Sequence, residues 1–246
     1  MQLKEARVWS VLAAAVVMVL LVEYTLRGFT GPAVRLARLF YPVLLSGVAG
    51  LILHQKFRPA LESIGWHRPV TAGAAVGMLG ALPMGLVLAM THNLSATALA
   101  DPLRLLETSL GAALREETFF RGLIFINLWR HSRLKFKGAM LVSALLFGAA
   151  HLPGQWQTAS ATSLLGIAVL TAAGGAFYAW LVAQWQSLWL AISLHAGMNL
   201  FWSLFAVGSH AAASGSTGQT SRIVTIVFMV VITELRRRKR ERADSL

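Results

Sequence analysis

Residues 187–207 read SLWLAISLHAGMNLFWSLFAV and contain no lysine, arginine, aspartate or glutamate. A helix needs about 20 predominantly apolar residues to cross the hydrocarbon core of a bilayer, so this stretch predicts a membrane-spanning helix. Seven more stretches have a similar character, although the fifth and the eighth in chain order are short. The predicted spans are Val8–Leu26, Val34–Leu53, Val70–Met90, Leu103–Trp129, Gly138–Leu152, Ser163–Gln184, Ser187–Val207 and Arg222–Leu235.

The composition of the 246 residues supports the same fold class. Hydrophobic residues make up 56% and charged residues 13%, about half of the roughly 25% that soluble domains carry. This excludes a disordered chain and disfavours a soluble nucleic-acid-binding protein. The absence of cysteine excludes disulfides, cysteine nucleophiles and thiolate metal sites. We predict an all-α, polytopic transmembrane helix bundle of about eight spans, forming a single membrane-embedded domain over residues 1–246.

The positive charges predict how the chain lies in the membrane. Of the 22 lysines and arginines, fifteen fall in one set of connections and five in the opposite set. Cytoplasmic loops carry the excess of positive charge, so both termini are predicted to be cytoplasmic in a multi-pass protein of the cell membrane. The basic tail, residues 236–246, is interpreted as a topology determinant that touches anionic lipid. The bilayer is thus an expected partner and nucleic acid is not.

The fourth predicted span contains an unusual cluster of charges. Asp101 is the expected N-cap of its helix, with Pro102 at the first helical position. Within it, Glu117 and Arg121 have the i,i+4 spacing of an ion pair, whereas Glu116 points about 100° away from Glu117. The arginine therefore neutralises one carboxylate while the other faces a cavity, or the whole cluster is an ion-pair network that holds helices together.

Two other spans carry polar pairs at the spacing of one helical turn. Phe147 and His151 share a face of the fifth span, and His195 and Asn199 share a face of the seventh. A single histidine in an apolar helix is more often a packing residue. A histidine beside an asparagine also fits an interhelical hydrogen bond, which is worth about 1 kcal/mol.

The depths of these residues agree with one another. At about 1.5 Å per helical residue, Glu116 and His151 lie roughly 20 Å from the cytoplasmic ends of their spans. His195 and Asn199 lie roughly 12 and 18 Å from theirs. Ionisable groups inside a membrane are costly and mostly face the interior of the bundle. We therefore predict one polar cavity lined by spans 4, 5 and 7.

A cavity of this kind supports two routes to peptide hydrolysis. A glutamate beside a histidine can take a proton from water, while a second histidine and an amide donate to the oxyanion that forms at the attacked carbonyl. Alternatively, Glu116, His151 and His195 could hold a divalent metal such as zinc. The chain contains no Gly-x-Ser-x-Gly elbow, no His-Glu-x-x-His pair and no phosphate-binding loop.

The ordered set Glu116-Glu117-x-x-x-Arg121, Phe147-x-x-x-His151 and His195-x-x-x-Asn199 resembles the three motifs of the CPBP family. This family, also called the Abi family, includes CAAX prenyl endopeptidases and bacteriocin-processing or immunity proteins. The similar region runs from about residue 103 to 207, and every motif position is filled.

The resemblance implies an intramembrane endopeptidase that acts on a membrane-associated peptide or protein. It implies that Glu116 and His151 activate water, that His195 and Asn199 stabilise the oxyanion, and that Glu117 and Arg121 support them. Members have been described as metal-dependent and as glutamate-dependent. We favour the route without a cofactor because asparagine is a poor zinc ligand and no cysteine is present. The alternatives are a transporter or proton relay and a non-catalytic membrane partner such as an immunity protein.

Overall fold

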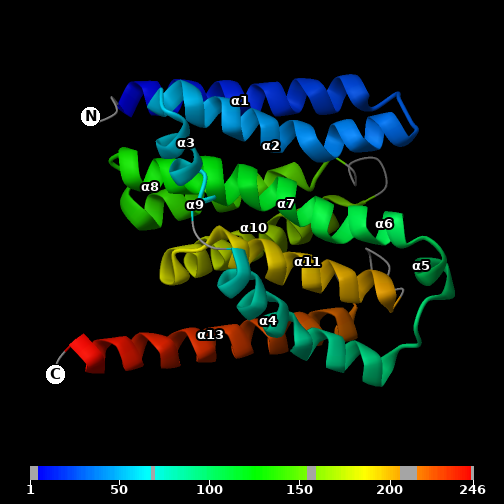
Figure 1. Cartoon of the computed structure of the whole chain (residues 1–246). Coiled ribbons are helices and arrows are strands. Elements are labelled where there is room, and N and C mark those ends of the chain that lie inside the picture. The colour runs from blue at the N-terminus through cyan, green and yellow to red at the C-terminus, as the bar shows by residue number, and fades with distance from the viewer. Residues whose placement is uncertain (1–4, 68–69, 154–158, 206–214, 245–246) are drawn as a thin grey trace. The chain divides into compact units, whose positions relative to one another are not determined.

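The computed structural model describes residues 5–67, 70–153, 159–205 and 215–244. Within these ranges the chain is helical and has no strand, which confirms the all-α fold (Figure 1). The helical segments, with π-helices labelled η, are α1 (Glu5–Leu26), α2 (Pro32–His54), α3 (Phe57–Ser63), α4 (Val70–Thr91), α5 (Ala96–Ala100), α6 (Pro102–Leu106), η1 (Glu107–Gly111), α7 (Ala112–Glu116), η2 (Glu117–Ile126), α8 (Asn127–His131), α9 (Lys135–Ala150), α10 (Ala161–Trp185), α11 (Leu188–Leu204) and α13 (Ser216–Asp244).

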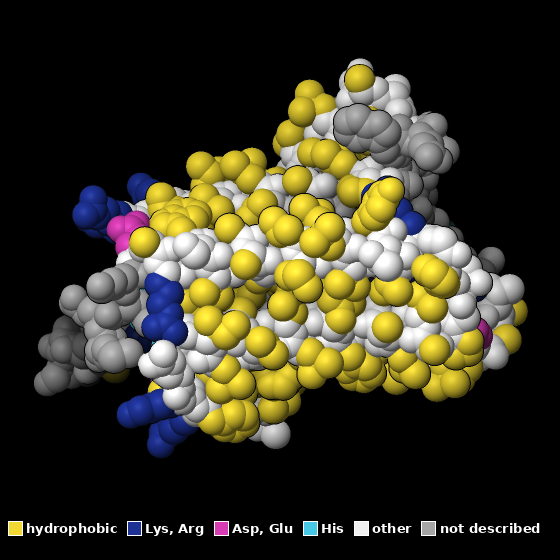
Figure 2. Space-filling model, turned by 90° about the horizontal axis from the view of Figure 1, so that it is seen from above, with side chains coloured by type: hydrophobic (Ala, Val, Ile, Leu, Met, Phe, Trp, Pro, Cys, Tyr) yellow, Lys and Arg dark blue, Asp and Glu magenta, His cyan; other side chains and the backbone are white. Residues whose placement is uncertain are grey.

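Five of these helices, α1, α2, α4, α10 and α13, are long and apolar enough to cross a membrane, and α11 is a shorter apolar helix. Their outward faces carry large apolar side chains, among them Leu20, Leu44 and Leu86, each more than half exposed. Hydrophobic side chains are spread over the face of the molecule that Figure 2 shows. Such surfaces suit lipid rather than water, so the protein is a helical membrane protein.

Each of the eight predicted spans falls on a helical stretch of the structure. The number of crossings and the cytoplasmic placement of the termini stay predictions. The end of the predicted seventh span, residues 206–207, and the end of the basic tail, residues 245–246, lie outside the described residues.

The helical run from residue 102 to 131 differs from the regular α-helix predicted for the fourth span. It begins as expected, because the Asp101 carboxylate accepts a hydrogen bond from the Arg104 amide at 3.0 Å and Pro102 follows as the first helical residue. Two π-helical segments, η1 and η2, then interrupt the α-helix. All ten residues of η2 are buried. The wider i→i+5 turns of a π-helix are here stabilised by the segments packed around them.

The chain forms two compact units. The first comprises Met1–Pro69 and Leu114–Val182, and the second comprises Val70–Ala113 and Ala183–Leu246. The prediction that residues 1–246 form a single domain stays a prediction.

In the first unit, α1 and α2 lie side by side, and η2 packs against both α2 and α9 (Figure 1). Its apolar core includes Leu53, Phe125 and Leu128, each less than 2% exposed. The carbonyl of Phe120 in η2 accepts a hydrogen bond of 2.8 Å from the Ser143 hydroxyl of α9. This contact satisfies a backbone group inside an apolar core, where an unpaired carbonyl would be costly.

In the second unit, α4 packs along α11 and also against α13. Glycines of α4 make this close approach possible. A Cβ at Gly77 would overlap the Ser193 side chain and lie 2.8 Å from the Leu194 amide, and one at Gly80 would overlap the Met229 sulfur. Small residues at interfaces of membrane helices allow backbones to approach in this way.

Candidate active site

The predicted ion pair of the first motif is present and completely buried. Arg121 Nη1 lies 3.2 Å from Glu117 Oε1, and neither side chain has any exposed surface. Taking two charges out of water is expensive unless each compensates the other. The pair is therefore held together within the interior of the first unit.

Two aromatic rings contact the arginine of this pair. The Arg121 guanidinium carbon lies 4.0 Å from the ring centroid of Phe147 on α9 and 5.3 Å from that of Tyr178 on α10. A guanidinium over a ring face gains a cation–π attraction that is stronger when water is excluded. Space for it depends on Gly175, where a Cβ would come within 3.3 Å of Arg121 Nη2.

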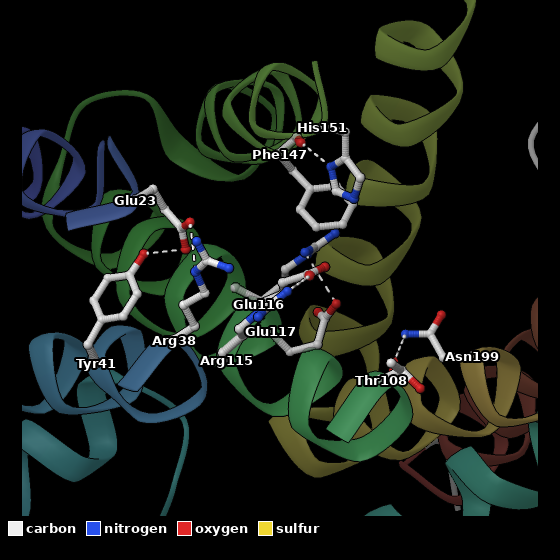
Figure 3. Close-up of polar contacts among 11 residues, drawn as sticks. Glu23, Arg38, Tyr41, Thr108, Arg115, Glu116, Glu117, Phe147, His151 and Asn199 are labelled. Carbon is white, nitrogen blue, oxygen red and sulfur yellow. Dashed lines mark hydrogen bonds and ion pairs between the residues drawn. The ribbon is translucent and has the colours of Figure 1, made fainter. Parts of the chain in front are cut away.

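The second motif adjoins the first through Phe147. The ring centroids of Phe147 and His151 are 4.6 Å apart, and the two rings meet edge to face. His151 Nδ1 lies 2.8 Å from the Phe147 carbonyl oxygen (Figure 3). Because a carbonyl oxygen only accepts, Nδ1 is the donor in this bond. The other ring nitrogen, Nε2, is then left as the proton acceptor of the neutral imidazole.

One detail of the second motif differs from the prediction. His151 was expected inside the fifth span, but α9 ends at Ala150 and His151 is its C-cap. The amide of Leu152 bonds the carbonyl of Ala149, three residues back. The residue before a proline avoids the α-helical conformation, and Pro153 follows Leu152. The histidine consequently lies at the end of the helix.

Glu116 has a different environment from its neighbour. Its carboxylate lies 3.4 Å from Arg115 Nη2, and its side chain is 18% exposed, whereas the side chain of Glu117 is completely buried. Figure 3 shows Arg115, Glu116 and Glu117 on one helical run. Adjacent carboxylates with different surroundings can take different chemical roles.

The third motif belongs to the second unit. His195 and Asn199 both lie on α11, and Asn199 Nδ2 is 3.5 Å from the Thr108 carbonyl of η1 (Figure 3). The structure thus brings Glu117, Arg121 and His151 together through Phe147. The cavity that all three motifs were predicted to line stays a prediction.

Several residues of these clusters were not singled out from the sequence. Tyr178 lies in an apolar run, and nothing in its spacing links it to the motifs. Arg115 lies inside the fourth predicted span and was given no role, although a charge within a membrane span is itself a signal of function.

A second polar cluster also went unnoticed, at the end of α2. The fully buried Asn127 accepts from His54 Nε2 at 3.3 Å and donates to the carbonyls of Ser63 and Leu123. The ring centroid of His131 lies 5.4 Å from the ring centroid of His54. Burial, together with the nearby His54 and Arg130, lowers the pKa of His131, which keeps this imidazole neutral at neutral pH.

The possible metal ligands of the sequence were Glu116, His151 and His195. Among the described residues, no group of three or more histidine, aspartate and glutamate side chains is gathered closely enough to hold a metal ion. The metal route stays a hypothesis.

The fold and the buried cluster define a helical membrane protein with an ion pair, Glu117 with Arg121, in the interior of its first unit. Comparison with family models then gives the particular family: residues 97–201 match the model described as Type II CAAX prenyl endopeptidase Rce1-like. The match supports a CPBP-family intramembrane protease and confirms the predicted enzyme class. The match contains every residue of the three motifs. No curated protein and no solved structure matches the chain.

Proposed function

We propose that this protein is an endopeptidase that cuts a peptide bond of a membrane-associated protein or peptide with water activated by Glu116 and His151. The observation that carries the proposal is the unbroken series of contacts from Glu117 through Arg121 and Phe147 to His151. These contacts join the first two motifs in the interior of the first unit. Of the two adjacent glutamates, Glu116 is the one whose carboxylate keeps some exposed surface.

In the proposed reaction, water attacks the carbonyl carbon of the scissile bond. Glu116 takes the proton that the water loses, assisted by His151 through Nε2. His195 and Asn199 donate hydrogen bonds to the oxyanion that forms. When the carbon–nitrogen bond breaks, the proton passes to the leaving amine, so that a carboxylate and an amine result.

Glu117 and Arg121 are positioning residues in this proposal. Both are completely buried, so neither is reached by water or substrate. Arg121 contacts the ring against which His151 packs. The pair would therefore orient the imidazole, because catalytic groups need support that holds them within a fraction of an ångström.

The description of the matched family suggests the first substrate to test. A synthetic peptide with a farnesylated cysteine followed by two aliphatic residues and a terminal methionine is the probe, compared with the same peptide without the farnesyl group. Cleavage by the purified full chain in detergent is followed by mass spectrometry of the released tripeptide. A wild-type protein that cuts neither peptide would count against this function.

The catalytic assignment is tested by Glu116→Gln, which keeps the size of the side chain but removes its basicity. We expect the cleavage rate to fall by roughly 10²–10⁴-fold, with an unchanged Tm. Glu62→Gln is the matched control, because Glu62 is a half-exposed partner of Arg58 on α3 and should keep the full rate. Cleavage by Glu116→Gln at the wild-type rate would remove Glu116 from the mechanism.

The same assay separates the two hydrolytic routes. In the glutamate route, a chelator leaves the cleavage rate unchanged. Loss of cleavage with the chelator and recovery with added zinc would instead favour a metal held by Glu116, His151 and His195.

A further inference from the structure

The basic segment at the end of α13 forms part of a surface hollow. Residues 236–242 read RRRKRER, and the helix that carries them ends the second unit (Figure 1). Its arginines line a hollow of about 100 Å³ together with the end of α10. The lining residues are Gln184, Thr233, Arg236, Arg237, Arg240 and Glu241.

Arg236 is held in a fixed place beside this hollow. Its guanidinium carbon lies 4.0 Å from the ring centroid of Trp185, and Nη1 lies 3.4 Å from the Gln184 carbonyl oxygen. The indole itself is anchored, because Trp185 Nε1 donates to Thr233 Oγ1 at 2.8 Å. A guanidinium with restricted freedom loses less entropy when it binds an anion.

The arginines around the hollow differ in whether a carboxylate already compensates them. Arg237 contacts both Glu234 and Glu241. Among the described residues, no carboxylate lies within ion-pair distance of Arg236 or Arg240. These two arginines are one helical turn apart and both line the hollow, so their guanidinium groups offer an uncompensated pair of charges to one anion.

The hollow lies where two apolar helices end. Trp185 is the last residue of α10, and the apolar part of α13 reaches Leu235, which is 60% exposed. Tryptophan is enriched at the interface between membrane and water, where its ring sits at the level of the lipid headgroups. An anion at this level has an apolar helix surface beside it for acyl chains, which a free phosphate or a nucleic acid would not use.

We propose that Arg236 and Arg240, supported by Trp185, bind the phosphate of an anionic phospholipid headgroup in this hollow. The site is separate from the peptidase motifs and does not depend on the proposed cleavage. Its ligand is a lipid such as phosphatidylglycerol, whose phosphate accepts hydrogen bonds from both guanidinium groups and whose acyl chains lie along α13.

The test measures lipid retention by the full chain in detergent, with native mass spectrometry and the Tm as readouts. Phosphatidylglycerol is expected to remain bound and to raise the Tm, and phosphatidylcholine is not. Arg236→Gln with Arg240→Gln should weaken phosphatidylglycerol binding by roughly tenfold or more. The charge-matched control is Arg238→Gln with Lys239→Gln, whose side chains do not line the hollow and whose loss should leave binding nearly unchanged.

Arg240→Gln alone covers the case in which loss of the Arg236–Trp185 contact impairs folding. Arg240 is exposed on the helix surface, so this variant should keep its lipid-free Tm and still bind phosphatidylglycerol several-fold more weakly. Equal losses for the hollow pair and its control would mean diffuse attraction and would overturn the proposal. Displacement of the lipid by millimolar inorganic phosphate or by a short RNA would overturn it as well.

Discussion

The two units of this protein hold their helices together by different means. In the first unit, η2 packs on α2 and α9, and the charged pair of Glu117 and Arg121 is surrounded by aromatic rings, one of them from α10. In the second, α4 meets α11 and α13 through glycines that let backbones nearly touch. The first interface depends on electrostatic compensation, and the second depends on the absence of side chains.

This difference bears on where chemistry can occur. A buried charge must be compensated by partners in fixed positions, and the same partners hold adjacent groups in place. The unit that buries Glu117 and Arg121 is also the one that contains Glu116 and His151. The glycine contacts of the second unit bring backbones together without a buried ion pair, and the polar motif residues there, His195 and Asn199, lie on α11 itself. Three kinds of substitution test this difference: removal of the buried charge of Arg121, filling of the space at Gly77, and removal of the ring of Phe147.

The largest effect is expected from removing the buried charge. Arg121→Met leaves the Glu117 carboxylate in the interior without its cation, and breaking a buried pair in this way costs about 3–5 kcal/mol. We expect a large fall in Tm in detergent and loss of peptide cleavage. Arg237→Met is the matched control on the exposed surface of α13, and it should leave the Tm unchanged.

A double variant sharpens this prediction. Glu117→Gln combined with Arg121→Met removes both charges and should recover much of the stability, since replacing a whole buried pair is often nearly neutral. Cleavage should stay low, because His151 has lost the support that reaches it through Phe147. If cleavage returned together with the Tm, the pair would be structural only.

A smaller effect is expected from filling the space between α4 and α11. Gly77→Ala adds a Cβ that overlaps Ser193 and approaches the Leu194 amide. Overpacking of this kind costs about 1–3 kcal/mol, seen as a lower Tm. Gly166→Ala on α10 is the control, because its Cβ would meet nothing within 4 Å and alanine favours the helix. Equal behaviour of the two variants would contradict the glycine contact.

The smallest effect is expected from removing the ring that joins the first two motifs. Phe147→Leu keeps an apolar side chain but loses the cation–π contact with Arg121, worth about 0.5–2 kcal/mol, so the Tm should fall modestly. The cleavage rate should fall more than the Tm suggests, because His151 loses the ring against which it packs. Phe177→Leu is a suitable control, since that ring contacts Tyr178 and Trp180 rather than the motifs. A rate unaffected by Phe147→Leu would show that the ring does not position His151.

The sequence by itself determined the class of the fold and the contacts made within one helical turn. The long apolar runs predict helices in lipid because backbone groups must be satisfied internally there. The cap at Asp101 and the pairing of Glu117 with Arg121 follow from helix geometry, which brings residues three or four apart onto one face. The contact between Phe147 and His151 has the same origin.

Only the tertiary structure decided which turns became π-helical, where α9 ends relative to His151, and which rings enclose Arg121. It also decided that Arg236 rests on Trp185, a residue 51 positions earlier in the chain. The physical reason is that bonding within a turn depends on neighbours along the chain, whereas these features depend on side chains that arrive from distant helices. Tyr178 reaches Arg121 only after α10 has packed at Gly175 against α9 and η2, and no pattern of neighbouring residues predicts that contact.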